Sequence, residues 1–215
     1  MRERVSRDKV ARFAGLAVAA VVISLASPTA SVAYEQRSNT VSFGIQGGMA
    51  SVLRGTGEFT RGEARVPYDR YGAAGAFALH LRYSLDRSHA VGLTFEDLRF
   101  DREEAIDPET GQSLPEQYQL NLFSFDYYLY YHRKSKLSQY LALGAGFHRP
   151  TFRISDRESY LPGEGFSANF GGGMEYFVAK PFSFDGSVRC HLNKVKGGAV
   201  WAGEALLGFQ YYLLR

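Results

Sequence analysis

Alternation of apolar and polar side chains restricts the fold of this 215-residue chain more than any other feature. From residue 41 onward apolar residues repeatedly occupy every second position, and no stretch there keeps a helical period. A period of two is typical of β-strands that have two unlike faces. Eight segments show it: 41–50, 73–85, 89–96, 123–132, 140–148, 166–179, 182–193 and 200–215. Each offers room for about the 9–11 residues that a tilted strand needs to cross a bilayer.

The N-terminal segment has a different character. Its first twelve residues carry five basic side chains: Arg2, Arg4, Arg7, Lys9 and Arg12. Residues 13–26 are uncharged, and the small residues Ser31 and Ala33 follow at the spacing of a signal-peptidase site. The alternative is a permanent helical anchor, but this uncharged stretch is short of the 20 or so residues that a spanning helix needs. We therefore predict that residues 1–33 are a cleaved secretory signal peptide and that residues 34–215 are the mature domain.

Removing this leader changes the charge of the protein. The whole chain has 25 basic and 22 acidic residues, and its formal net charge of +3 suggests an anionic partner such as nucleic acid. Five of the basic and two of the acidic residues lie in the leader, so the remaining chain has 20 of each. We therefore expect no nucleic-acid partner. A single cysteine, Cys190, excludes an intramolecular disulfide and a zinc site of the CxxC type.

The connections between the eight segments also alternate. Long polar loops are expected at 54–71, 101–117 and 153–165, short turns at 86–88, 134–136 and 180–181, and a connection of middling length at 194–199. This arrangement is typical of bacterial outer-membrane barrels, in which turns are periplasmic and long loops extracellular. The loop at 101–117 has six acidic side chains and one basic one. Such a run is usually only solvated, although it is also able to bind divalent cations or a basic partner.

Side-chain size indicates which face of the strands points outward. A soluble lipocalin also has eight alternating strands, but its apolar face points inward. The interior of an eight-stranded barrel is only just wide enough to be filled by side chains, and the large apolar face of these segments would overfill it. We therefore predict an all-β, eight-stranded antiparallel up-and-down transmembrane β-barrel. Aromatic residues near the strand ends form the expected girdle: Tyr83, Tyr127, Tyr131, Tyr176, Phe182, Phe184, Trp201 and Tyr211.

The predicted inner face carries charges of both signs, listed here: His80, Arg82, Glu96, Asp126, His132, Glu175, Asp185, Arg189, His191 and Glu204. Charges that are shielded from water are costly unless they are paired, so we interpret this set as a network that fills a polar lumen. The alternatives are a narrow channel for small solutes and an enzyme that modifies lipid A. Ser187 and His191 share a face, but at about 3.3 Å per residue they are too far apart for a direct hydrogen bond. We predict no catalytic residue, cofactor or metal site.

Three segments resemble a known family. YLALGAGFHR (140–149), FGGGMEYFVAKPFSFDGSVRCH (170–191) and LGFQYYLLR (207–215) resemble the eight-stranded outer-membrane β-barrel proteins, which include the membrane domain of outer-membrane protein A and the smaller proteins X and W. The last strand of that family usually ends in an aromatic residue, whereas this chain has Arg215. The resemblance implies a monomer in the Gram-negative outer membrane with a structural, surface-interaction or adhesive role. It also implies contact with outer-membrane lipid and lipopolysaccharide, and with the barrel-assembly machinery during biogenesis.

Overall fold

A computed structural model describes residues 38–56, 58–61, 64–67, 71–106, 113–131, 136–154, 157–160, 164–195 and 198–213. The predicted signal peptide and His132 lie outside these residues. All regular structure in these residues is β-strand. They contain no helix that is long and apolar enough to span a membrane.

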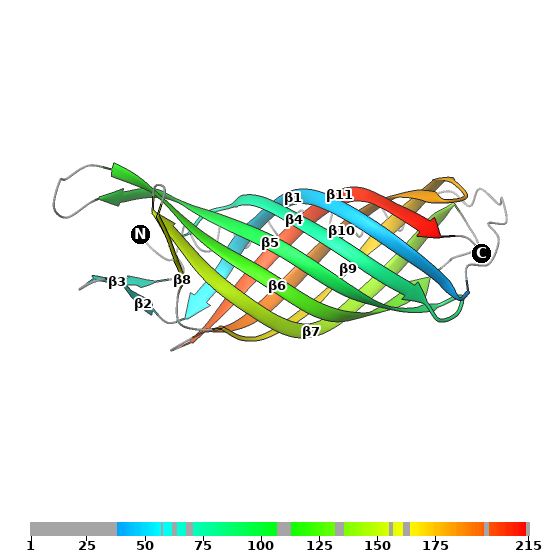
Figure 1. Cartoon of the computed structure of the whole chain (residues 1–215), viewed down its shortest axis with the longest axis horizontal. Helices are drawn as coiled ribbons and strands as arrows, with labels where there is room; N and C mark the ends of the chain where they lie inside the picture. The colour runs from blue at the N-terminus through cyan, green and yellow to red at the C-terminus, as the bar shows by residue number, and fades with distance from the viewer. Residues whose placement is uncertain are drawn as a thin grey trace.

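Eight long strands form a closed antiparallel barrel (Figure 1). They are β1 (Thr40–Thr56), β4 (Ala74–Ser84), β5 (His89–Ile106), β6 (Ser113–Tyr131), β7 (Leu137–Ile154), β9 (Gly165–Ala179), β10 (Phe182–Val195) and β11 (Gly198–Leu213). Each strand pairs with its neighbours along the chain, and β1 pairs with β11 to close the ring, with Val41 opposite Leu213. The predicted fold is therefore confirmed. Three short strands complete the described structure: β2 (Glu58–Arg61), β3 (Ala64–Pro67) and β8 (Arg157–Tyr160).

The two ends of the barrel differ as the sequence predicts, but several strands reach further towards the loop end than predicted. Short connections join β4 to β5, β6 to β7 and β9 to β10 at one end, called here the turn end, where β1 begins and β11 stops. At the opposite loop end, β5 and β6 pair as far as Ile106 and Ser113, so most of the predicted loop at 101–117 is strand. The predicted loops at 54–71 and 153–165 contain β2–β3 and β8, and strand pairing reaches Val195 and Gly198. These boundaries were wrong because backbone pairing continues where the lipid-facing alternation stops.

Burial alternates along the strands. In β10 the charged and polar positions are buried, from Ser183 to Asn193, whereas Phe182 and Phe184 are about half exposed. Large apolar side chains are exposed on every barrel strand, from 38% for Phe77 to 76% for Leu207. An apolar outer wall of this kind is stable in lipid and unfavourable in water.

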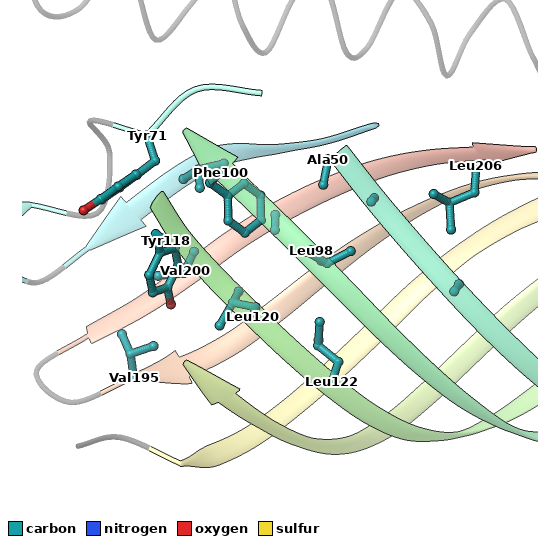
Figure 2. Close-up of a cluster of buried hydrophobic side chains, with 14 residues drawn as sticks. Ala50, Tyr71, Leu98, Phe100, Tyr118, Leu120, Leu122, Val195, Val200 and Leu206 are labelled. Carbon is teal, nitrogen blue, oxygen red and sulfur yellow. The ribbon is translucent and has the colours of Figure 1, made fainter. Parts of the chain in front are cut away.

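Towards the loop end of β5 the apolar side chains change from the outward to the inward positions, where Leu98 and Phe100 lie (Figure 2). Phe95 points outward and Glu96 inward, but beyond them Leu98 and Phe100 are buried while Arg99 is half exposed. A set of buried apolar side chains fills this part of the interior, and we call it the loop-end cluster: Ala50, Val52, Tyr71, Ala76, Ala78, Leu98, Phe100, Tyr118, Leu120, Leu122, Val195, Val200, Ala202 and Leu206. The lumen is therefore polar only in part, which corrects the prediction of a polar lumen throughout.

Candidate functional site in the barrel interior

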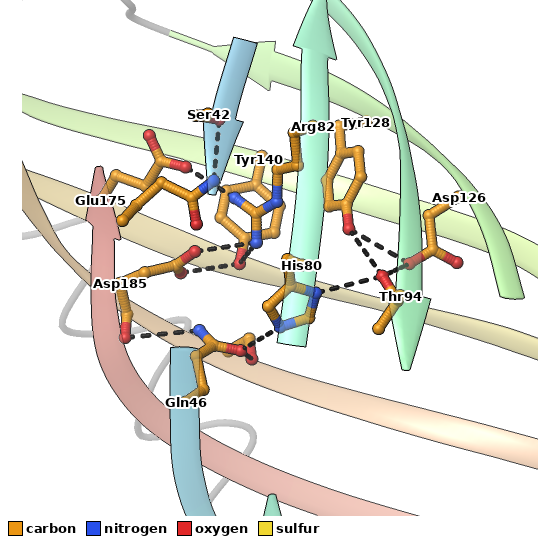
Figure 3. Close-up of polar contacts among 12 residues, drawn as sticks. Ser42, Gln46, His80, Arg82, Thr94, Asp126, Tyr128, Tyr140, Glu175 and Asp185 are labelled. Atoms are coloured by element: carbon orange, nitrogen blue, oxygen red, sulfur yellow. Dashed lines mark hydrogen bonds and ion pairs between the residues drawn. The ribbon is translucent and has the colours of Figure 1, made fainter. Parts of the chain in front are cut away.

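Arg82 on β4 is the centre of the polar network nearest the turn end (Figure 3). Its guanidinium Nη1 lies 2.6 Å from Glu175 Oε1 on β9, and its Nη2 lies 2.8 Å from Asp185 Oδ2 on β10. Tyrosine hydroxyls supply further hydrogen bonds to the two carboxylates: Tyr130 donates to Glu175 at 3.0 Å and Tyr140 donates to Asp185 at 2.8 Å. Both acids are thus compensated by charge-assisted bonds, which is what burial requires.

Arg189 on β10 organises a second centre. Its Nη1 lies 2.8 Å from Asp126 Oδ2 and 3.4 Å from Glu96 Oε1, and its Nη2 donates to the Tyr128 hydroxyl at 2.9 Å. Asp126 also accepts a hydrogen bond of 2.6 Å from Thr94. Because these groups come from β5, β6 and β10, the contacts cross the lumen as well as following the wall.

Neutral side chains connect the two centres. His80 lies between Thr94 and Gln46, with its Nδ1 3.0 Å from Thr94 Oγ1 and its Nε2 2.7 Å from Gln46 Oε1. Gln46 in turn donates to the backbone oxygen of Asp185 at 3.4 Å. The Tyr128 ring stacks on Arg82, whose guanidinium carbon lies 4.4 Å from the ring centroid. The two arginine centres therefore belong to one continuous network.

A third group contains two acids and one histidine. His191 Nδ1 lies 3.6 Å from Glu96 Oε2, and His191 Nε2 lies 3.4 Å from Glu204 Oε1. All three side chains are at most 1% exposed. Arg189 contacts this group through Glu96, whose Oε1 lies 3.4 Å from the arginine Nη1.

Two inward glycines provide space for the network. A Cβ added to Gly144 would overlap the Asp126 carboxylate and stand 2.5 Å from Asn169 Nδ2. At Gly173 the added atom would stand 2.5 Å from the Tyr140 hydroxyl. Glycine is therefore needed at these inward positions, because side chains of the network occupy the place where a Cβ would lie.

The structure brings nine of the ten predicted interior residues together, since each of those described is at most 1% exposed. His132 is outside the described residues. Sequence reasoning did not select the neutral members of the network, listed here: Gln46, Thr94, Ser124, Tyr128, Tyr130, Tyr140, Asn169 and Tyr212. The available signal was their position on the same face as the charges.

The aromatic residues predicted to form a girdle lie on the outer wall. Seven of them are near the turn end and are between 38% and 49% exposed: Tyr83, Tyr127, Tyr131, Tyr176, Phe182, Phe184 and Tyr211. Trp201 lies towards the loop end and is of intermediate exposure. The rings of Phe182 and Tyr211 pack across strands with centroids 4.9 Å apart.

The pair considered for nucleophilic catalysis is not joined in the described structure. Ser187 Oγ donates to Gln46 Oε1 at 3.2 Å, while the ring nitrogens of His191 face Glu96 and Glu204. A serine nucleophile needs a base within hydrogen-bond reach of its hydroxyl, and here the described serine instead bonds an amide.

No family model and no curated protein matches the sequence. Among solved structures, Neisserial surface protein A matches with a TM-score of 0.55 and 15% identity, over 82% of this chain and 98% of that one. The N-terminal barrel domain of Pseudomonas aeruginosa OprF has a TM-score of 0.47 and 18% identity, over 83% and 100% of the two chains. OprG of the same organism has a TM-score of 0.47 and 13% identity, over 83% and 98%. In its closed ring of eight long strands and its apolar outer wall, the chain has the fold of the eight-stranded outer-membrane β-barrels.

Proposed function

We propose that the protein is a closed, non-catalytic barrel of the outer membrane, with a structural or surface-interaction role exerted from its loop end. The observation that carries this proposal is the filling of the interior by two different layers. Ion pairs cross the polar layer, where Arg82 joins β4 to β9 and Arg189 joins β10 to β6. Above them, the loop-end cluster occupies the mouth with side chains that are at most 8% exposed.

The loop end also supports a role at the surface. Beyond Phe95 the outer face of β5 and β6 is polar and internally bonded: Gln119 donates to Asp97 at 2.7 Å and Gln117 donates to Asp101 at 2.9 Å. Figure 1 shows these two strands projecting beyond the rest of the barrel. A two-stranded projection with a polar outer face is suited to contact with a partner outside the membrane.

The outer wall supports contact with lipid or lipopolysaccharide. Four phenylalanines lie in register on adjacent strands, from Phe95 through Phe123 and Phe147 to Phe166. They line a groove of about 450 Å³, whose rim carries Arg149 in an ion pair of 3.3 Å with Glu164. An apolar floor with a charged pair at its rim matches an acyl chain that carries a polar headgroup.

Planar bilayers provide the direct test of closure. We expect the purified, refolded protein to insert without conductance steps, because side chains of the two layers fill the described interior. An eight-stranded barrel leaves space for side chains rather than for a channel. A porin inserted under the same conditions is the control for the bilayer. Reproducible steps from the folded protein would overturn the closed-barrel proposal.

The absence of catalysis has a separate test. Lipid A is compared by mass spectrometry in cells that express the protein, the Ser187→Ala variant, or neither. We expect identical acyl patterns in all three. Loss or gain of an acyl chain with the unaltered protein, absent with Ser187→Ala, would show that the protein is an enzyme.

A further inference from the structure

Glu96, His191 and Glu204 bring ligand atoms together from three strands. One atom from each residue lies within 4.8 Å of the other two, and the side chains come from β5, β10 and β11. On one side the backbone neighbour of each is an alanine of the loop-end cluster: Ala78 pairs with Glu96, Ala202 with His191 and Ala50 with Glu204. On the other side the backbone neighbours are larger: Leu122 beside Glu96, Asn169 beside His191 and Arg189 beside Glu204.

Hydrogen bonds within the described structure leave this group unsatisfied. Both carboxylate oxygens of Glu204, Glu96 Oε2 and both ring nitrogens of His191 are buried and have no hydrogen-bond partner there. The Glu175 carboxylate, by comparison, accepts hydrogen bonds from Arg82, Tyr130 and Tyr212. A buried carboxylate without comparable partners is costly.

The charges point to a missing cation. Arg189 lies 2.8 Å from Asp126 and 3.4 Å from Glu96, so its single positive charge is shared between two carboxylates and does not balance Glu204 as well. Glu96 and Glu204 then present two negative charges to one imidazole. A single divalent cation balances two carboxylates and accepts a neutral imidazole as a third ligand.

The spacing agrees with metal coordination. The two nitrogen–oxygen separations, 3.4 and 3.6 Å, exceed an ordinary hydrogen bond. Zinc bonds to nitrogen and oxygen of about 2.0–2.2 Å place neighbouring ligand atoms of a tetrahedron roughly 3.3–3.6 Å apart, and the 3.4 Å between His191 Nε2 and Glu204 Oε1 matches this spacing. Glu96 lies beside the other ring nitrogen, and one ligand atom from each of the three residues lies within 4.8 Å of the other two, so the Glu96 side chain would have to move to join the same ion. We propose that Glu96, His191 and Glu204 bind one Zn²⁺-like divalent ion inside the barrel, tying β5 to β10 and β11. A mixed imidazole and carboxylate set favours a first-row transition metal over Mg²⁺ or Ca²⁺, which take mainly oxygen ligands.

Burial beneath the loop-end cluster determines how the ion enters. All three ligands are at most 1% exposed, so exchange through the folded wall is slow and loading accompanies folding. The full chain is therefore refolded into detergent with and without one equivalent of Zn²⁺, treated with EDTA, and assayed for zinc by mass spectrometry of the element. We expect one zinc per folded chain to survive EDTA and to be released when urea is added.

Matched variants locate the site. Glu204→Gln and His191→Gln are expected to lose the retained zinc, whereas His80→Gln keeps it, because His80 is an equally buried histidine bonded to Gln46 and Thr94. Only folded protein, judged by its mobility on unboiled gels, is counted, and Glu96→Gln replaces any variant that fails to fold. A Co²⁺-loaded sample of the unaltered protein should show tetrahedral ligand-field bands. Absence of retained metal in the folded unaltered protein, or equal retention in the ligand variants, would overturn the site. Neither result depends on whether the barrel conducts.

Discussion

At the scale of the residue, the smallest side chains set the geometry of the network. Gly144 leaves the space that the Asp126 carboxylate occupies, whereas a Cβ at the outward Gly47 would meet only the Ala76 backbone oxygen, at 3.9 Å. We expect Gly144→Ala to lower the free energy of unfolding by about 1–3 kcal/mol through overpacking. Gly47→Ala is the control and should change it by less than about 1 kcal/mol. Urea titration followed by the fluorescence of Trp201, the single tryptophan, measures both. Equal effects would contradict the packing argument.

A buried and a half-exposed arginine should differ strongly in their contribution to the free energy of unfolding. Arg82 is buried between Glu175 and Asp185, and Arg99 is half exposed beside Asp97. Arg82→Met leaves two buried carboxylates without their cation, so we expect a loss of about 3–5 kcal/mol. Arg99→Met should cost less than about 1 kcal/mol, as is usual for an exposed pair.

The same unfolding assay compares these two arginine variants in one lipid or detergent. A small effect of Arg82→Met would mean that tyrosine hydroxyls alone satisfy the two acids, and that the ion pairs contribute little to closure.

Sequence reasoning located the charged interior residues but not their partners. Alternation assigns Arg82 and Glu175 to one face, because position along a strand fixes which side a residue points to. The two residues are 93 positions apart in the sequence. Whether they meet depends on the stagger between paired strands around the closed barrel. Tyr130 and Tyr140 sit on that face too, yet their hydroxyl contacts follow from side-chain conformations that sequence spacing does not specify.

At the scale of the element, β5 shows why the predicted strand ended too early. Its apolar residues fall on odd positions through Phe95 and on even positions at Leu98 and Phe100. A strand search that keeps one phase stops at Glu96, whereas the backbone continues to Ile106. The reversal marks the place where the outer solvent changes from lipid to water. A shift of one residue exchanges the two faces of a strand, and here the apolar pattern shifts although the backbone does not.

The loop-end part of β6 should consequently behave like the core of a soluble protein. Leu120 is fully buried opposite Leu98, and its neighbour Gln119 faces outward. We expect Leu120→Ala to cost about 2–5 kcal/mol, as in other well-packed cores. Gln119→Ala should cost less than about 1 kcal/mol, because the group it removes is partly hydrated.

Unfolding of both β6 variants is measured with the Trp201 signal. If Leu120→Ala were no more harmful than Gln119→Ala, the loop-end cluster would not be a tightly packed layer.

At the scale of the whole molecule, closure of the ring should make the fold resistant to detergent. Each of the eight long strands has a paired neighbour on both sides, including β1 with β11 and β6 with β7, so the ring has no edge strand at which unfolding would start. We expect unboiled protein to migrate faster than boiled protein on an SDS gel, because the compact barrel persists until it is heated. Equal mobility of samples taken directly from membranes would contradict a closed barrel.

The central claim is that the outer face of the barrel contacts lipid from the turn end as far as Phe95 and contacts water beyond it, at the loop end. It is tested most directly by nitroxide labels placed one at a time on β5 at Leu93, Phe95, Asp97 and Arg99, with Cys190→Ser as background. In lipid vesicles, relaxation by oxygen is compared with relaxation by a water-soluble nickel complex. The account predicts that oxygen dominates at Leu93 and Phe95 and that the nickel complex dominates at Asp97 and Arg99. Dominance of oxygen through Arg99, or of the nickel complex already at Leu93, would contradict it.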